Sequence, residues 1–284
     1  MNILLLGGCH TGNYGIQNHL GFARQWATHL EVETHEPVQL QRLCMVKLTH
    51  LDSLLGQYRT AFQQADRIVL QLGHYELSWR RPFRELFGPN APGLTTPSIY
   101  KPGAMARKPA ESFYQAACQP RYLPWRELAK TTVLQACSLL GYEVPYLQLF
   151  RQQVAAAFHR LAPYRHKISV LTPFPTLNPL DHWLRAQCHD YIIACAMAES
   201  FVVADTFAAI PRHPAYFLAD GVHLNSLGHT VLGLFLSELS WAEAPLPAPG
   251  RPVWAEPASD RAYAGPVPAA FPFFSKTAGP AGAL

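Results

Sequence analysis

The sequence predicts an α/β fold, a three-layer α/β/α sandwich around a central parallel sheet. Short apolar runs that end at glycines are typical of buried strands, and stretches with apolar residues at helical spacing lie between them. Strands that alternate with helices in this way form a parallel sheet with helices on its faces. A hydrophobic content of 49% and an aromatic content of 12% suit a packed core.

The first half of the chain supplies the clearest alternation. Residues 2–7 are an apolar run that breaks into glycines, which predicts the first strand. Apolar residues then recur at helical spacing from 16 to 30, and residues 31–38 are expected to form a second strand. A second helix is predicted over 48–62 and a third strand over 67–72.

Residues 76–123 interrupt this pattern. The stretch is rich in proline, arginine and aromatic residues and has no steady periodicity. An irregular segment of this length within a compact domain is usually functional. We therefore expect an insertion or lid over the functional site.

The pattern resumes in the second half and then ends. Helices are expected over 124–140, 145–162 and 180–199, strands over 167–171 and 201–204, and a last helix after Gly228. Residues 1–242 thus form the predicted α/β domain. Residues 243–284 hold 9 of the 25 prolines and predict a flexible tail, because such a segment buries too little surface to offset its ordering entropy.

Charge and hydropathy exclude several classes of function. The net charge is +4, and the 23 basic residues form no long cluster, which argues against nucleic-acid binding. The apolar runs fall short of the roughly 18 residues that a membrane span needs. The N-terminus lacks a basic region followed by an apolar core, so we expect a cytoplasmic protein.

The stretch from Asp220 to His229 carries the strongest chemical signal. His223 follows Asp220 by three residues, in a short turn before an apolar run. On such a turn the carboxylate can accept from Nδ1–H of the imidazole, which leaves Nε2 available as a base. A His–acid pair of this kind calls for a nucleophile elsewhere in the chain.

Cys9 is the candidate nucleophile. It stands where the first strand breaks into Gly7 and Gly8, and glycines there permit a tight turn. A helix that begins near Gly12 would direct its positive dipole end at the thiol, and such a dipole or an imidazole favours the reactive thiolate. The other five cysteines have no zinc-type spacing and are expected to be reduced and mostly buried.

These blocks resemble the SGNH/GDSL hydrolase family over residues 1–240. The first block matches Gly7, Cys9 and Thr11, with cysteine where the family usually has serine, and the last matches Asp220 and His223. A middle block, glycine–x–asparagine, matches Gly73 but has Tyr75 in place of asparagine. The family's lone glycine before the second helix has no counterpart, because residues 34–55 contain no glycine.

The resemblance implies a covalent mechanism. His223, oriented by Asp220, takes the proton from Cys9, and the thiolate attacks an acyl carbonyl to form a thioester that water or an alcohol then cleaves. The positions expected to hold the oxyanion or substrate are Gly8, His10, Gly73, His74, Tyr75 and Glu76. Glu76 is equally compatible with capping local structure.

The cysteine bears on the reaction class. Moving an acyl group from a thioester such as acyl-CoA onto a thiol is close to energetic parity, whereas taking it from an oxygen ester is uphill. Gly7-Gly8-Cys9-His10 is similar to the glycine–asparagine–cysteine–glutamine motif of a branch that resembles capsular-polysaccharide O-acetyltransferases. The implied activity is that of an esterase or O-acyltransferase on a carbohydrate or other small O-acyl substrate, without a cofactor beyond an acyl-CoA donor.

Two alternatives stay open at this point. The replaced asparagine and the missing glycine remove family oxyanion donors, and each is worth on the order of 3 kcal/mol, so the fold can serve as a catalytically impaired binding module. Cys9, His10, His74 and His223 together could also hold zinc, although no metal is expected.

Overall fold

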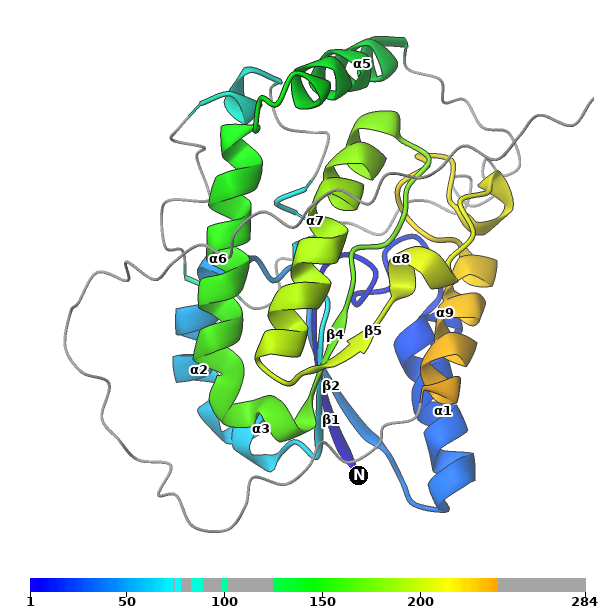
Figure 1. The fold of residues 1–284 in the computed structure, drawn as a ribbon. Coiled ribbons are helices and arrows are strands. Elements are labelled where there is room, and N and C mark those ends of the chain that lie inside the picture. Colours follow the sequence, from blue (N-terminus) through cyan, green and yellow to red (C-terminus); the bar gives the residue numbers. More distant parts are fainter. Residues whose placement is uncertain (74, 78–82, 89–98, 102–124, 240–284) are drawn as a thin grey trace, which may run out of the picture. The chain divides into compact units, whose positions relative to one another are not determined.

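The computed structural model describes residues 1–73, 75–77, 83–88, 99–101 and 125–239. These residues form a parallel sheet with the strand order β2-β1-β3-β4-β5 and with helices on both faces (Figure 1). The strands are β1 (Asn2–Leu6), β2 (Gln39–Leu43), β3 (Arg67–Leu70), β4 (Ile168–Leu171) and β5 (Val202–Ala204). The predicted fold class is confirmed.

The central strands are apolar throughout because both of their faces are covered. On β1, Leu4 and Leu6 belong to one core cluster, whereas Ile3 and Leu5 belong to the other. Neighbouring strands keep this register, since Leu4 pairs with Ile68 of β3. This double burial explains why the run lacks polar–apolar alternation.

Each face of the sheet has its own set of helices. The first core cluster is completed by α2 (Leu51–Gln57), α3 (Arg59–Gln64), α6 (Pro145–Leu161) and α7 (Pro179–Ala198). The second is completed by α1 (Phe22–Thr34) and α9 (Ser226–Glu238), which pack against each other although they come from opposite ends of the domain (Figure 1). The shorter α8 (Thr206–Ala209) follows β5, and α5 (Trp125–Leu139) precedes α6.

The second strand lies later in the chain than predicted. Residues 31–34 complete α1, which ends at His35 in the left-handed region with φ 55°, and β2 begins only at Gln39. This strand is at the edge of the sheet, where Gln39 and Gln41 are exposed. Edge position removes the requirement for a continuous apolar run, so the hydrophobic pattern predicted the wrong segment.

The first helix also begins later than predicted. The residues after β1 form turns, and α1 starts at Phe22 rather than near Gly12. The dipole of that helix therefore does not point at Cys9, which corrects one source of thiolate stabilisation expected from the sequence. The helix predicted over 48–62 is divided at Tyr58 into α2 and α3, after a short 3₁₀ turn at Leu48–His50.

The second half of the domain follows the prediction closely. The expected helices appear as α5, α6, α7 and α9, and the expected strands appear as β4 and β5. The tail predicted over 243–284 lies outside the described residues, as does most of the predicted lid over 76–123. No helix in the described ranges combines the length and apolar character needed to cross a bilayer.

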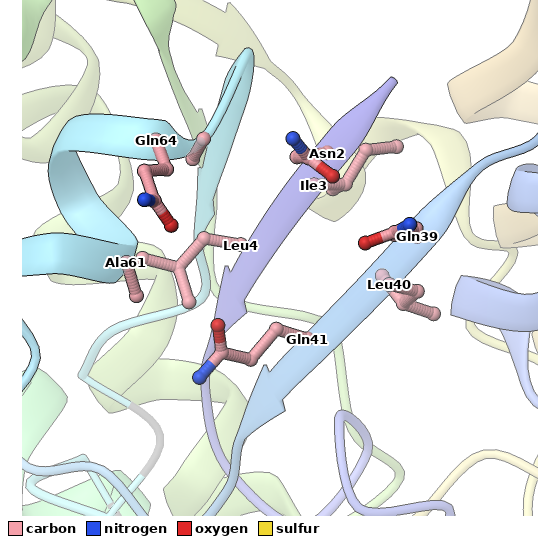
Figure 2. A pocket seen from close by; sticks show the side chains of 9 residues that line it. Asn2, Ile3, Leu4, Gln39, Leu40, Gln41, Ala61 and Gln64 are labelled. Carbon is pink, nitrogen blue, oxygen red and sulfur yellow. The ribbon is translucent and has the colours of Figure 1, made fainter.

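A hollow of about 310 Å³ opens beside α3 at the amino-terminal halves of β1 and β2 (Figure 2). Its lining residues are Asn2, Ile3, Leu4, Gln39, Leu40, Gln41, Ala61, Gln64 and Ala65. The residues that the sequence singles out for chemistry instead follow the carboxyl ends of the strands, where ligands bind in open α/β sheets.

Candidate active site

Asp220 and His223 form a self-contained pair in the loop before α9. The carboxylate Oδ2 lies 2.6 Å from Nδ1 of His223, and Oδ1 accepts from the backbone N–H groups of Val222 and His223, each at 3.0 Å. One carboxylate thus orients both the ring and the backbone that carries it. Asn225 caps α9 directly afterwards by accepting from Gly228 N at 3.0 Å.

The charges of this pair are strongly coupled. Burial lowers the pKa of His223, but its hydrogen bonds to Asp220 and Cys9 outweigh burial and raise the pKa to about 9. Burial raises the pKa of Asp220, whereas the bond to His223 lowers it, and the net direction is down. Both effects favour an imidazolium beside a carboxylate at neutral pH.

Cys9 comes to this pair from the turn after β1. Its thiol shares a hydrogen bond with the His223 ring. Its Sγ also lies 3.1 Å from the Tyr75 hydroxyl and 4.0 Å from Sδ of Met45. Segments that follow β1, β2 and β3 therefore meet the loop before α9 at one sulfur atom.

The turn that carries Cys9 depends on glycine at position 7. A Cβ there would lie 2.1 Å from Oγ1 of Thr11 and 2.6 Å from Oε1 of Gln71. That Gln71 oxygen accepts from Gly8 N at 3.2 Å and from the Thr11 hydroxyl at 2.8 Å. The Gly8 amide thus donates into the protein in this structure, and its expected role toward an oxyanion stays a prediction.

His10 makes contacts inside the protein that connect two parts of the site. It is buried, and its Nε2 accepts from Leu224 N at 3.2 Å, so the ring is neutral at that nitrogen. The ring centroid lies 5.4 Å from that of His223 and 4.9 Å from that of Phe174, which it meets edge-on. His10 therefore joins the Cys9 turn to the His223 loop, and the substrate-binding role expected for it stays a prediction.

The block after β3 places only one of its described residues against Cys9. Gly73 has φ 87°, and a Cβ there would lie 2.9 Å from the Phe150 ring, so glycine is required. Glu76 is fully buried and accepts from Leu48 N at 2.8 Å, which is the capping alternative rather than the substrate one. Tyr75 reaches the sulfur, and burial together with Cys9 raises the pKa of its phenol. His74 lies outside the described residues.

Metal binding finds no support in the geometry of the described ranges. They hold no group of at least three His, Cys, Asp or Glu side chains positioned for a metal ion. Among the four residues considered for zinc, His10 uses its Nε2 lone pair to accept a hydrogen bond from Leu224 N, so this nitrogen does not offer that lone pair to a metal.

Comparison with known proteins identifies the fold. No family model matches the sequence, and no curated protein matches it. Among solved structures, a lipase/acylhydrolase from Enterococcus faecalis is 15% identical with a TM-score of 0.52, covering 83% of this chain and 93% of that one. The acetylxylan esterase Axe2 from Geobacillus stearothermophilus is 15% identical with a TM-score of 0.51, covering 84% and 95%. The lipase Lip_vut3 from a goat rumen metagenome is 14% identical with a TM-score of 0.51, covering 83% and 95%.

The chain shares the fold of these esterases and lipases. At such identities the likeness concerns the fold, and the chemistry has to be argued from the side chains. Two residues of this region were not predicted from the sequence: one contacts Cys9, and the other binds the loop that follows β4.

Met45 is the first of these. It follows β2 with φ 63°, a left-handed conformation that favours glycine, and its thioether accepts a hydrogen bond from the Tyr75 hydroxyl. The backbone after β2 thus has a glycine-type conformation at a residue that is not glycine. No sequence signal marks it, because methionine rarely adopts this conformation.

Arg185 on α7 is the second. Its side chain is only 2% exposed, and Nη1 donates to the Phe174 carbonyl at 2.7 Å. The sequence feature that could have indicated it is the i,i+4 spacing of Asp181 and Arg185 in a largely apolar helix.

Proposed function

We propose that this chain is an SGNH/GDSL-type enzyme that moves acyl groups through a covalent acyl–Cys9 intermediate. The observation that carries the proposal is the convergence of Cys9, His223 and Asp220 at the carboxyl edge of the sheet. The fold it shares with proteins described as lipases and esterases is consistent with this chemistry.

The first step is ionisation of the nucleophile. The proton of the Cys9 thiol passes to Nε2 of His223, while Asp220 holds Nδ1 at 2.6 Å. Because the pKa of His223 is raised to about 9, the imidazolium form persists at neutral pH and balances the thiolate. The site thus favours an ion pair that is ready to attack.

The second step is attack on the acyl carbonyl. A bond forms between Sγ and the carbonyl carbon, and negative charge collects on the carbonyl oxygen. The Tyr75 hydroxyl, 3.1 Å from Sγ, is the side-chain donor placed to stabilise that charge, in the role that the family gives to asparagine. The carbon–leaving-group bond then breaks, and the imidazolium returns its proton to the leaving group.

The third step releases the acyl group. Water or an alcohol gives its proton to His223 and attacks the thioester, and the Cys9 thiolate leaves. A thioester donor such as acyl-CoA exchanges one thioester for another, whereas an oxygen-ester donor must form a thioester uphill. The thiol therefore favours an O-acyltransferase over a plain esterase, with a carbohydrate or other small hydroxyl compound as acceptor.

A catalytically impaired binding module is the competing function. Two contacts favour it: the Gly8 amide donates to Gln71, and the Tyr75 hydroxyl donates to Met45. To stabilise an oxyanion, the Tyr75 hydroxyl would have to give up its hydrogen bond to Met45. Each missing hydrogen bond to the oxyanion costs about 3–4 kcal/mol of transition-state stabilisation.

Acyl labelling separates these functions. The protein is incubated with acetyl-CoA or with p-nitrophenyl acetate, and the tryptic peptide Met1–Arg24, which holds Cys9 as its only cysteine, is mapped by mass. Acetyl mass on this peptide from acetyl-CoA supports transfer, and labelling with turnover from the ester alone supports hydrolysis. Cys9→Ala should abolish either signal, and Cys137→Ala on α5 is the matched cysteine control. Absence of both adduct and turnover in the wild type would favour the binding module.

A further inference from the structure

Helix α7 carries a buried charge pair that the proposed mechanism does not use. The side chains of Arg185 and Asp181 are 2% and 0% exposed, and Nη2 lies 3.7 Å from Oδ2. Removing two charges from water costs several kcal/mol each, and a pair at this separation recovers only part of that cost. Replacement of such a pair by well-packed apolar residues is often neutral or stabilising, so a buried ion pair is weak evidence of a role in stability.

The guanidinium is joined to the proposed site by a short series of contacts. Nη1 donates to the Phe174 carbonyl at 2.7 Å, in the loop that follows β4. The Phe174 ring meets His10 edge-on at 4.9 Å, and His10 accepts from Leu224 N beside His223. In the described part of the chain, Nε of Arg185 is buried without a hydrogen-bond partner. The guanidinium is therefore held by the Phe174 carbonyl and by Asp181.

Cys9 lies within electrostatic reach of this cation. Burial lowers the pKa of Arg185, whereas the charges of Asp181 and Cys9 raise it. Electrostatic coupling is reciprocal, so a charged guanidinium favours the thiolate form of Cys9 to the same extent.

Other titratable groups also face the thiol and the guanidinium. Those that interact with Cys9 are His223 from the loop before α9, Tyr75 after β3 and Cys44 after β2. His182, on the same helix as Arg185, has a pKa lowered to about 4 by burial and by the charges of Arg212 and Arg185. It is neutral at pH 7, so it adds no positive charge beside Arg185.

We propose that Arg185 is a positioning residue of the site, whose fixed positive charge favours the ionised Cys9–His223 pair and whose bond to Phe174 supports the loop behind His10. This inference rests on the proposed function, because it concerns the nucleophile of that reaction. Asp181 acts in the opposite direction and limits the field of the guanidinium.

The test is the pH dependence of Cys9 alkylation by iodoacetamide, followed on the Met1–Arg24 peptide. Arg185→Met should raise the alkylation midpoint by about half a pH unit or more, and Arg185→Lys, which keeps the charge, should restore most of it. Asp181→Asn should lower the midpoint, since it removes the opposing charge. An electrostatic role requires that removal of the positive charge at Arg185 and removal of the negative charge at Asp181 shift the midpoint in opposite directions.

A stability control keeps the test decisive. Arg185→Met removes the cation that faces the buried Asp181 carboxylate, which can destabilise the protein by itself. The alkylation midpoints of Asp181→Asn and of the double variant Asp181→Asn/Arg185→Met are therefore compared, because these two proteins differ only at residue 185 and both lack the carboxylate. The double variant should have the higher midpoint. A lowered melting temperature with an unchanged midpoint in both comparisons would assign Arg185 a purely structural role and overturn the inference.

The wild type distinguishes this inference from the proposed function. A wild-type midpoint near the ordinary thiol value of about 8.5 would contradict an activated Cys9 and defeat both. A depressed wild-type midpoint that is insensitive to Arg185 and Asp181 would leave the proposed function standing and reject the role of Arg185.

Discussion

The loop before α9 and the turn after β1 bring their chemistry together in different ways. In the loop, Asp220 binds His223 and the backbone between them, so every partner lies within three residues. In the turn, Gly8 and Thr11 bind Gln71, and Cys9 meets Tyr75, each partner sixty or more residues away. The acid–base half of the site is local, whereas the nucleophile half exists only after β1 and β3 have paired.

This difference implies different sensitivities to mutation. Mutation of the loop should change the chemistry and leave the fold intact, because the hydrogen bonds of Asp220 stay within residues 220–223. Damage to the turn should disturb both, because its hydrogen bonds tie two strands of the sheet together. The predictions below test that contrast.

The largest effect on activity is expected in the loop. Asp220→Asn keeps the shape of the side chain but removes the charge that orients and stabilises the imidazolium, and kcat should fall about 10³–10⁴-fold. The pKa of His223 should also fall from its raised value of about 9, which shifts the alkaline limb of the pH–rate profile to lower pH. The protein should still fold, with a melting temperature at pH 7 that falls only by the stability linked to the raised pKa of His223, and a loss of folding would contradict the local character of the pair.

Tyr75→Phe probes the nucleophile half without altering its packing. The hydroxyl that lies 3.1 Å from Sγ is lost, and kcat should fall about 10²-fold if it is the oxyanion donor. Tyr142→Phe is the matched control, because that tyrosine is 47% exposed. Equal activity of the two variants would remove Tyr75 from the mechanism.

Gly7→Ala should break the turn itself. The new Cβ would lie 2.1 Å from the Thr11 hydroxyl oxygen, and we expect a loss of about 2–4 kcal/mol in the free energy of unfolding. Gly56→Ala on α2, where a Cβ meets nothing within 4 Å, should instead gain up to about 1 kcal/mol. Chemical denaturation of both variants measures the difference, and a tolerated Gly7→Ala would refute the close-approach requirement.

The smallest expected effect is the pH dependence of the free energy of unfolding, to which two histidines contribute with opposite signs. Burial and the charge of His223 lower the pKa of the fully buried His229 to about 3. Below about pH 6.5, His229 is protonated in the unfolded chain but stays neutral in the folded protein. This difference lowers the free energy of unfolding by up to about 1.4 kcal/mol per pH unit as the pH falls from 6.5 to 3. The contribution of His223 has the opposite sign: it is present below pH 6.5 and lost as the pH rises through about 9.

Urea denaturation at pH 7 and pH 5 measures the acid branch. His229→Gln, which retains a side-chain acceptor for Phe22 N, should flatten the decline relative to wild type. An equally steep decline in the variant would attribute the acid sensitivity to other groups.

Several features of the protein followed from the sequence because their causes are local. The apolar runs of β1, β3 and β4 and the helical spacing of α6, α7 and α9 predicted the sandwich. The Asp220–His223 pair was predictable since three residues of turn are enough to join carboxylate and imidazole. The placement of Cys9 followed from a strand that breaks into glycines.

Only the tertiary structure decided the remainder, because it depends on contacts between distant segments. An edge position freed β2 from the apolar pattern, and the pairing of β1 with β3 directed the Gly8 amide to Gln71. The pairing of β2 and β3 with opposite edges of β1 set the glycine-like backbone of Met45, after β2, against Tyr75, after β3. Residue types alone indicate which groups can react, whereas packing over long sequence separations determines which of them meet.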